Sequence, residues 1–246
     1  MKQPELIFIP GWGMEKQVWD SLLPYFQEYS VQHVEWRGVT ERTDFAERVE
    51  EAAQGKDVIL IGWSLGALAA LQVCDRIQTK GLILIGGTAK FTVDETYECG
   101  WKLPFVERMK RSLLKRKEDT LKCFYKSMFA KQEIKDSEQF ESIVAHFQGD
   151  SIESLQFGLD YLIEMDMRSQ LKQVKMPMLL IHGEQDAICP LSAARYIQEN
   201  TNGALKVISG AGHALCVTNF EYCANEMIQF IEGIQNDQQN VITKTI

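Results

Sequence analysis

The chain has 246 residues, of which 45% are hydrophobic and 24% charged, and its formal net charge at pH 7 is −8. This balance excludes collagen-like, low-complexity and disordered proteins, and the acidity argues against nucleic-acid binding. The apolar runs are far shorter than the ~18 residues that span a bilayer, and the N-terminal run is too short for a signal peptide. We therefore expect a soluble, cytoplasmic protein with one sizeable α/β domain and no membrane partner.

Cysteine and histidine spacing gives no metal-binding pattern. The six cysteines include no C-x-x-C pair, and the four histidines do not cluster at ligand spacing. In a chain of this size without a signal peptide, the cysteines are predicted to be reduced thiols. No metal site is expected.

Six short apolar runs predict the strands of a sheet. Helix-length segments separate most of them, which is typical of parallel strands joined by crossover helices. We expect an α/β fold with a mostly parallel sheet of about six strands. The runs lie at 6–9, 31–36, 58–61, 82–85, 178–182 and 205–208.

The long stretch between the fourth and fifth runs has helical periodicity. A structureless loop of this length would be uncommon in a compact domain, and one-sided helices predict a cap over the sheet. The division is a core of residues 1–88 and 167–246 and a helical cap of residues 89–166. The predicted cap helices fall within 105–113, 121–129, 140–147 and 152–163.

The third strand runs directly into a G-x-S-x-G motif, Gly62-Trp63-Ser64-Leu65-Gly66, followed by an Ala/Leu-rich helix. A serine hydroxyl is a weak nucleophile and must be held clear of the backbone, facing a base. A sharp turn from strand to helix does this, and the two glycines relieve the crowding that the turn creates. The strand and helix around the motif favour a nucleophilic Ser64 over an ordinary Gly/Ser turn.

A base and an orienting acid follow later strands, in the order Ser, Asp, His. Asp186 comes after the fifth run, and His213 comes after the sixth. Because the carboxyl ends of parallel strands meet at one edge of a sheet, Ser64, Asp186 and His213 are expected to converge there.

Other acids and one other histidine compete for these roles. Glu184 lies in the same loop as Asp186, and Asp160 and Asp166 lie in or just after the predicted cap. His182 is a rival base, but its place at a strand end is more typical of a core or supporting role.

The two amides expected to bind a developing oxyanion are those of Trp12 and Leu65. The Leu65 amide directly follows the nucleophile at the helix N-terminus, and Trp12 lies in the loop after the first strand. Gly11 and Gly13 would let this loop approach Ser64, although a tight turn between strand and helix would also use them.

Together these motifs resemble the α/β-hydrolase superfamily along essentially the whole chain. A narrower resemblance is to the pimeloyl-[acyl-carrier protein] methyl ester carboxylesterases of biotin synthesis, the BioH family. One departure is Pro10-Gly11, where that family has His-Gly. The stretches that carry the resemblance are Gly11 to Met14 with Val18-Trp19, Gly62 to Gly66, Met165 to Arg168 with Leu171 and Val174, and Met176-Pro177.

The resemblance implies hydrolysis of the methyl ester of pimeloyl-acyl-carrier protein, without a cofactor. It gives Ser64 the role of nucleophile, His213 that of base and Asp186 that of orienting acid, with Trp12 and Leu65 as the oxyanion hole. The substrate contacts that it implies are Trp12, Ser64, Leu65, Phe124, Tyr125, Lys126, Ser127, Met128 and His213. The alternatives are a general short-chain esterase or carbon–carbon bond hydrolase with the same triad, and a ligand receptor on this scaffold that turns over slowly or not at all.

Charge in the predicted cap gives an independent indication of a partner. Residues 101–135 contain eleven basic and four acidic side chains, so they carry +7 in a chain of −8, and the remainder carries −15. A basic cap on an acidic body would favour encounter with an acidic carrier protein. A solvated helix face is the alternative explanation.

Overall fold

The structure is a computed structural model that describes residues 3–133 and 150–243, with side chains described up to residue 236. Six strands form one all-parallel sheet in the order β2-β1-β3-β4-β5-β6. The predicted α/β fold and all six predicted strands are confirmed. The strands are β1 (Glu5–Ile9), β2 (Val31–His33), β3 (Val58–Trp63), β4 (Thr79–Ile85), β5 (Met178–Gly183) and β6 (Ala204–Ile208).

Strand β2 is shorter than predicted and ends at His33. The amide of Val34 still donates to Phe8 O, but the chain then turns so that Trp36 Nε1 donates to Pro10 O at 2.8 Å. Trp36 therefore packs beneath the loop after β1 instead of extending an edge strand.

Helices cover the sheet. Strands β1, β3 and β5 are buried along their whole length, because both faces of the sheet are covered, which explains their continuous apolar runs. In α2 (Leu65–Val73) every residue except Gln72 is buried, which matches its lack of a polar face. The other core helices are α1 (Asp44–Ala53), α7 (Leu191–Asn200), α8 (Leu215–Thr218) and α9 (Phe220–Thr243), with short 3-10 turns at Lys16–Trp19, Leu23–Phe26 and Leu171–Gln173.

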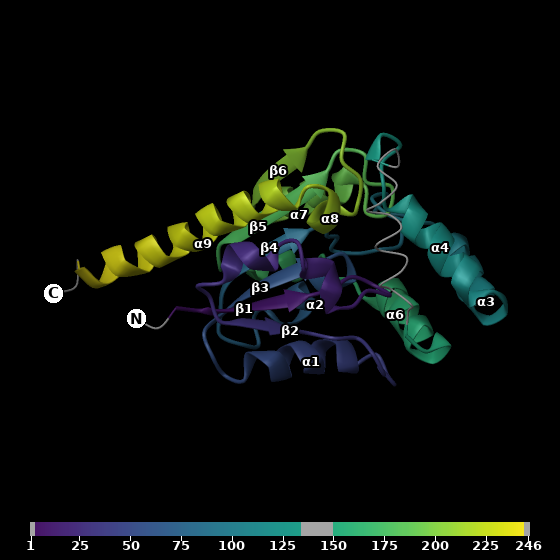
Figure 1. The fold of residues 1–246 in the computed structure, drawn as a ribbon, viewed down its shortest axis with the longest axis horizontal. Coiled ribbons are helices and arrows are strands. Elements are labelled where there is room, and N and C mark those ends of the chain that lie inside the picture. The colour runs from purple at the N-terminus through teal and green to yellow at the C-terminus, as the bar shows by residue number, and fades with distance from the viewer. Residues whose placement is uncertain (1–2, 134–149, 244–246) are drawn as a thin grey trace.

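The insertion between β4 and β5 includes three described helices, which lie together beyond the carboxyl edge of the sheet (Figure 1). They are α3 (Leu103–Lys115), α4 (Lys117–Ser127) and α6 (Ile152–Glu164). Helix α6 begins where the Ser151 hydroxyl accepts from Ser154 N, and its stripe of Leu155, Leu159 and Leu162 is buried. The predicted helix within 140–147 lies outside the described residues.

The chain leaves the sheet and returns to it at a braced junction. Lys90 and Asp166 form an antiparallel bridge, and Met167 N donates to Ala89 O at 2.8 Å. Asp166 also forms ion pairs with Lys90 at 3.1 Å and with Arg168 at 2.7 Å. The junction agrees with a cap of residues 89–166, a division that remains a prediction.

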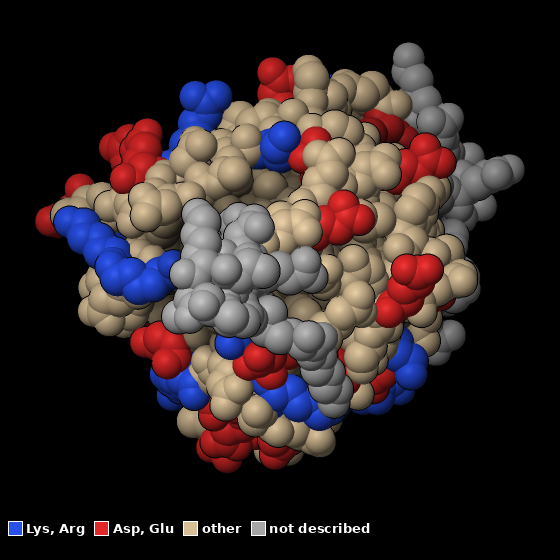
Figure 2. Space-filling model, turned by 90° about the vertical axis from the view of Figure 1, so that its left-hand side faces the viewer, with Lys and Arg blue, Asp and Glu red and all other residues tan. Residues whose placement is uncertain are grey.

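Charge is distributed differently on the two sides of the molecule. On the side that carries the chain ends, away from α3 and α4, acidic and basic side chains are interspersed (Figure 2). Helices α3 and α4, with Arg116 between them, expose more cations than acids. The acids are Glu118 and Asp119, and the cations are Arg108, Arg111, Lys115, Arg116, Lys122 and Lys126. Within the described part of the chain, no helix is both apolar enough and long enough to traverse a lipid bilayer.

Candidate active site

Ser64 occupies the sharp turn between β3 and α2. Its backbone has φ 57° and ψ −116°, a conformation that is strained for a residue with a side chain. A Cβ atom at Gly62 would meet the backbone of Gly66, and one at Gly66 would meet the carbonyl of Ile9. Both glycines are therefore required, for the steric reason that the G-x-S-x-G pattern predicts.

Asp186 and His213 form a buried pair at the carboxyl edge of the sheet. His213 Nδ1 lies 2.7 Å from Asp186 Oδ2, and the other carboxylate oxygen accepts from the amides of Ile188 and Cys189, each at 2.8 Å. Because a carboxylate oxygen can only accept a hydrogen bond, the ring nitrogen that faces Oδ2, Nδ1, carries the proton. This leaves Nε2 of the neutral imidazole as a base.

Residues that adjoin Ser64 contact this pair. Ser64 N donates to Ile85 O, and the next residue, Gly86, has φ +52° and lies against the imidazole, where a Cβ would come within 3.0 Å of His213 Nδ1. Trp63 Nε1 donates to His213 O at 3.0 Å. Among the described residues, His213 Nε2 is buried without a hydrogen-bond partner, Ser64 included. Such bonds are often loose before substrate binds.

The competing side chains are occupied elsewhere. His182 Nε2 lies 2.7 Å from Cys189 O and 3.4 Å from Asp186 Oδ2, and burial lowers the pKa of this imidazole. Neutral His182 therefore donates to the carbonyl and supports the loop of Asp186. The exposed carboxylate of Glu184 accepts from Ser209 Oγ and Gly210 N. Asp160 pairs with Lys110, and Asp166 belongs to the cap junction.

Two backbone amides remain available beside Ser64. Among the hydrogen bonds of residues 3–133 and 150–243, none uses the N–H of Trp12 or of Leu65. Gly11 brings the first loop against the nucleophile, since a Cβ there would lie 3.3 Å from Ser64 Cβ. The prediction that they bind a developing oxyanion therefore needs no existing hydrogen bond to break.

Cap helices hold the loop that carries Trp12. Trp12 Nε1 donates to Leu155 O on α6 at 2.8 Å, and Tyr125 Oη on α4 donates to Gly13 O at 3.0 Å. Gly158 gives the indole its space, because a Cβ there would lie 2.6 Å from Trp12 Cδ1. The loop is therefore fixed from above as well as by the sheet.

A second set of contacts was not anticipated from the sequence. The carbonyl of Met128, just after α4, accepts from His213 N at 2.6 Å and from Ala214 N at 3.2 Å. Glu133 Oε2 accepts from Ala130 N and Gly212 N at 2.7 and 2.9 Å. Gly212, directly before His213, is the one feature of the sequence that could have indicated this close approach, because a Cβ there would meet Met128 O at 2.5 Å.

The space next to Ser64 is narrow and apolar. It measures only about 10 Å³, which is close to the room of one water molecule. An ester can reach Ser64 only if side chains around this chamber move apart. The chamber is lined by Trp12, Ser64, Phe91, Trp101, Val106, Met109, Phe124, Leu159, Leu162 and Ile188.

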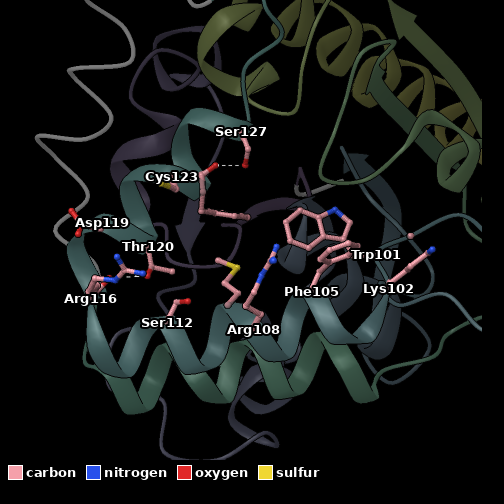
Figure 3. A pocket seen from close by; sticks show the side chains of 13 residues that line it. Trp101, Lys102, Phe105, Arg108, Ser112, Arg116, Asp119, Thr120, Cys123 and Ser127 are labelled. Atoms are coloured by element: carbon pink, nitrogen blue, oxygen red, sulfur yellow. Dashed lines mark hydrogen bonds between the residues drawn. The ribbon is translucent and has the colours of Figure 1, made fainter.

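A larger groove of about 690 Å³ lies between α3 and α4 (Figure 3). It shares Trp101, Met109 and Phe124 with the chamber. Of the predicted cap contacts, Phe124 lines both spaces and Ser127 lines the groove. Tyr125, Lys126 and Met128 are not among the described residues that line either space; Tyr125 and Met128 are buried and Lys126 is exposed.

Comparisons with known proteins agree with this geometry. The family model described as "Serine aminopeptidase, S33" matches residues 37–219. A pimeloyl-[acyl-carrier protein] methyl ester esterase from Aromatoleum aromaticum is 28% identical, with 95% of this chain and all of that protein covered. A biotin biosynthesis bifunctional protein, BioHC, from Cellvibrio japonicus is 26% identical over 87% of this chain but only 45% of its own length.

A solved structure shows the same fold. The bromoperoxidase from Bacillus anthracis superposes with a TM-score of 0.85 at 20% identity, covering 94% of this chain and 92% of its own. Together with the family model that matches residues 37–219, this confirms the resemblance to the α/β-hydrolase superfamily.

Proposed function

Because the chain belongs to the serine aminopeptidase S33 family of α/β-hydrolases, we propose that it is a serine carboxylesterase whose substrate is the methyl ester of pimeloyl-acyl-carrier protein. The observation that carries the proposal is the buried Asp186–His213 pair beside the strained turn of Ser64. The choice of substrate rests on the names of the similar proteins, which are pimeloyl-[acyl-carrier protein] methyl ester esterases.

The first half of the reaction forms an acyl-enzyme. Ser64 Oγ attacks the ester carbonyl carbon while His213 Nε2 takes the hydroxyl proton, and the carbonyl oxygen becomes an oxyanion between the amides of Trp12 and Leu65. Asp186 stabilises the resulting imidazolium through Nδ1–H. When the carbon–oxygen bond to the alcohol breaks, His213 returns the proton and methanol leaves.

The second half releases the acid. His213 Nε2 takes a proton from water, and the oxygen of that water attacks the acyl carbon. The same two amides bind the second oxyanion. Collapse breaks the bond to Ser64 Oγ, which recovers its proton from His213, so one water is consumed for each ester.

The chamber favours an ester over the peptide substrate that the family description suggests. An aminopeptidase must bind a positively charged amine, which requires an acceptor or an acid nearby. No Asp or Glu is among the described residues that line the chamber, and the adjoining groove has several cations and one acid, Asp119. A neutral ester matches these surroundings better than an ammonium group does.

The exposed cations of α3 and α4 support a carrier-borne substrate. They lie on the side of the molecule from which the groove opens, while the rest of the chain is strongly acidic. An acidic carrier protein would be steered toward them, chiefly through its encounter rate. Individual docking residues are not assigned.

The test uses a fluorophosphonate label together with ester hydrolysis. Wild type should be labelled and should hydrolyse the carrier-borne methyl ester, whereas Ser64→Ala should lose labelling and about 10³-fold or more in kcat, as removal of a triad member does. Serine 127, which also lines the groove, gives the matched control Ser127→Ala, which should still be labelled. Absent labelling and turnover in wild type would instead indicate a receptor on this scaffold. Turnover of free dimethyl pimelate alone would indicate a general esterase.

A further inference from the structure

The groove between α3 and α4 lies directly beside the chamber of Ser64. Trp101, Met109 and Phe124 line both spaces and form the wall between them. Figure 3 shows side chains of both helices that line the groove. When these three side chains move apart, an acyl chain whose ester carbonyl lies at Ser64 can extend into the groove.

The lining of the groove changes character along this route. Near the chamber it is apolar, with Trp101, Met109 and Phe124, whereas the exposed side chains that line it are Phe105 and the cations Lys102, Arg108 and Arg116, against the single acid Asp119. Within the described part of the chain, none of these three cations forms an ion pair. An apolar channel that ends at unpaired cations matches a ligand with an apolar chain and a negative far end.

Arg108 is the cation best placed to meet that far end. Its guanidinium lies 5.3 Å from the centre of the Phe105 ring, an arrangement that limits its freedom. In Figure 3 it rises from α3 into the groove beside Trp101, while Lys102 points away and Arg116 lies at the other end near Asp119. A planar guanidinium can bind a carboxylate or phosphate through two parallel hydrogen bonds.

We propose that this groove is the acyl subsite for esters whose chain ends in an anionic group, and that Arg108 determines this specificity. The proposal rests on Ser64 being the esterase nucleophile. The anion is either the free carboxylate of a dicarboxylic half-ester or a phosphate on the arm that joins the acyl chain to its carrier. Both would bind the Arg108 guanidinium, which forms no ion pair with the described residues.

The experiment compares charged and neutral substrates with the same chain. The substrates are the monomethyl and dimethyl esters of heptanedioic acid and the carrier-borne methyl ester, and the readout is the ratio of kcat/KM for each charged substrate to that for the diester. Arg108→Gln should lower this ratio about threefold to fivefold at low salt, mainly through KM, as expected for a partly exposed ion pair. Arg108→Lys should restore part of it, and roughly 0.5 M salt should shrink the effect.

Arg111 provides the matched control, because it is an exposed arginine of the same helix that does not line the groove. Arg111→Gln should leave the ratio unchanged. A response of the half-ester supports a carboxylate as the anion, and a response of the carrier-borne ester alone supports the phosphate. Equal ratios in wild type and Arg108→Gln for both charged substrates would overturn the proposal. Hydrolysis of p-nitrophenyl acetate by wild type but not by Ser64→Ala tests the esterase separately.

Discussion

The two sides of the candidate site are held in different ways. On the sheet, Asp186 and His213 are buried, and the carboxylate accepts from the imidazole and from two amides. On the cap, Arg108 and Arg111 of α3 form no ion pair with the described residues, and Phe105 is 48% exposed. Hydrogen bonds and burial thus hold the side chains at the sheet edge in one arrangement. The exposed side chains of the cap can take different positions for different esters. Changes at the edge should affect every ester equally, and changes in the groove should depend on the substrate.

The largest effect is expected from Asp186→Asn, which would break the comparison if it acted on some esters only. The new amide would keep its oxygen toward Ile188 N and Cys189 N and turn its NH₂ toward His213 Nδ1, so that Nε2 would carry the proton and lose its function as a base. We expect kcat to fall about 10³- to 10⁴-fold for charged and neutral esters alike. Steady-state kinetics on both substrates gives the measurement.

Glu184→Gln is the control for this change, because Glu184 lies two residues away in the same loop and its exposed carboxylate accepts from Ser209 and Gly210 at the surface. It should retain most of the activity. A Glu184→Gln defect as large as that of Asp186→Asn would contradict the assignment of the acid.

An intermediate effect is expected from Gly158→Ala, at the contact where cap and sheet edge meet. The added Cβ would lie 2.6 Å from Trp12 Cδ1 and 2.9 Å from Trp12 Nε1. Overpacking of this kind costs about 1–3 kcal/mol, more than the ~1 kcal/mol that alanine adds to helix stability. Denaturant unfolding should show a net loss, and kcat should fall because the Trp12 amide shifts.

The same substitution at Gly233 is the control, since a Cβ there meets nothing within 4 Å. Gly233→Ala should stabilise the protein slightly without changing kcat. Equal stabilisation by both variants would show that α6 moves freely over Trp12.

The smallest effect concerns His182, the buried histidine behind Asp186. Because burial lowers its pKa, the unfolded chain takes up a proton that the folded protein does not, and stability falls as pH drops below the ordinary value of about 6.5. His182→Gln keeps a donor for Cys189 O but cannot titrate. When the pH is lowered from 7.5 to 5.5, the free energy of unfolding should fall by about 1 kcal/mol less in His182→Gln than in wild type. An identical loss in the two proteins would show that His182 does not contribute.

Local sequence patterns predicted the parts of the molecule that depend on neighbouring residues. The run Val58–Trp63, the glycines around Ser64 and the helix after them specify the turn by their own sterics. Asp186 and His213 could be placed because strands β5 and β6 deliver them to the same edge.

The remaining features depend on contacts between distant segments, which no local pattern encodes. The carbonyl of Met128 receives the amide of His213 from 85 residues farther along the chain. Helical periodicity assigned Phe105 to an apolar stripe, but the structure places it on the rim of the groove. A period in the sequence identifies a face of a helix without showing whether protein or ligand covers it.

The bond from Met128 to the histidine loop also limits how lids can be exchanged between relatives. Because Met128 O and the Glu133 side chain hold the loop of His213, a chimera whose foreign lid includes residues 128–133 would also replace this support. A chimera that keeps residues 128–133 of this chain would keep the native anchor. Chimeras made to change the substrate range should therefore leave residues 128–133 unchanged.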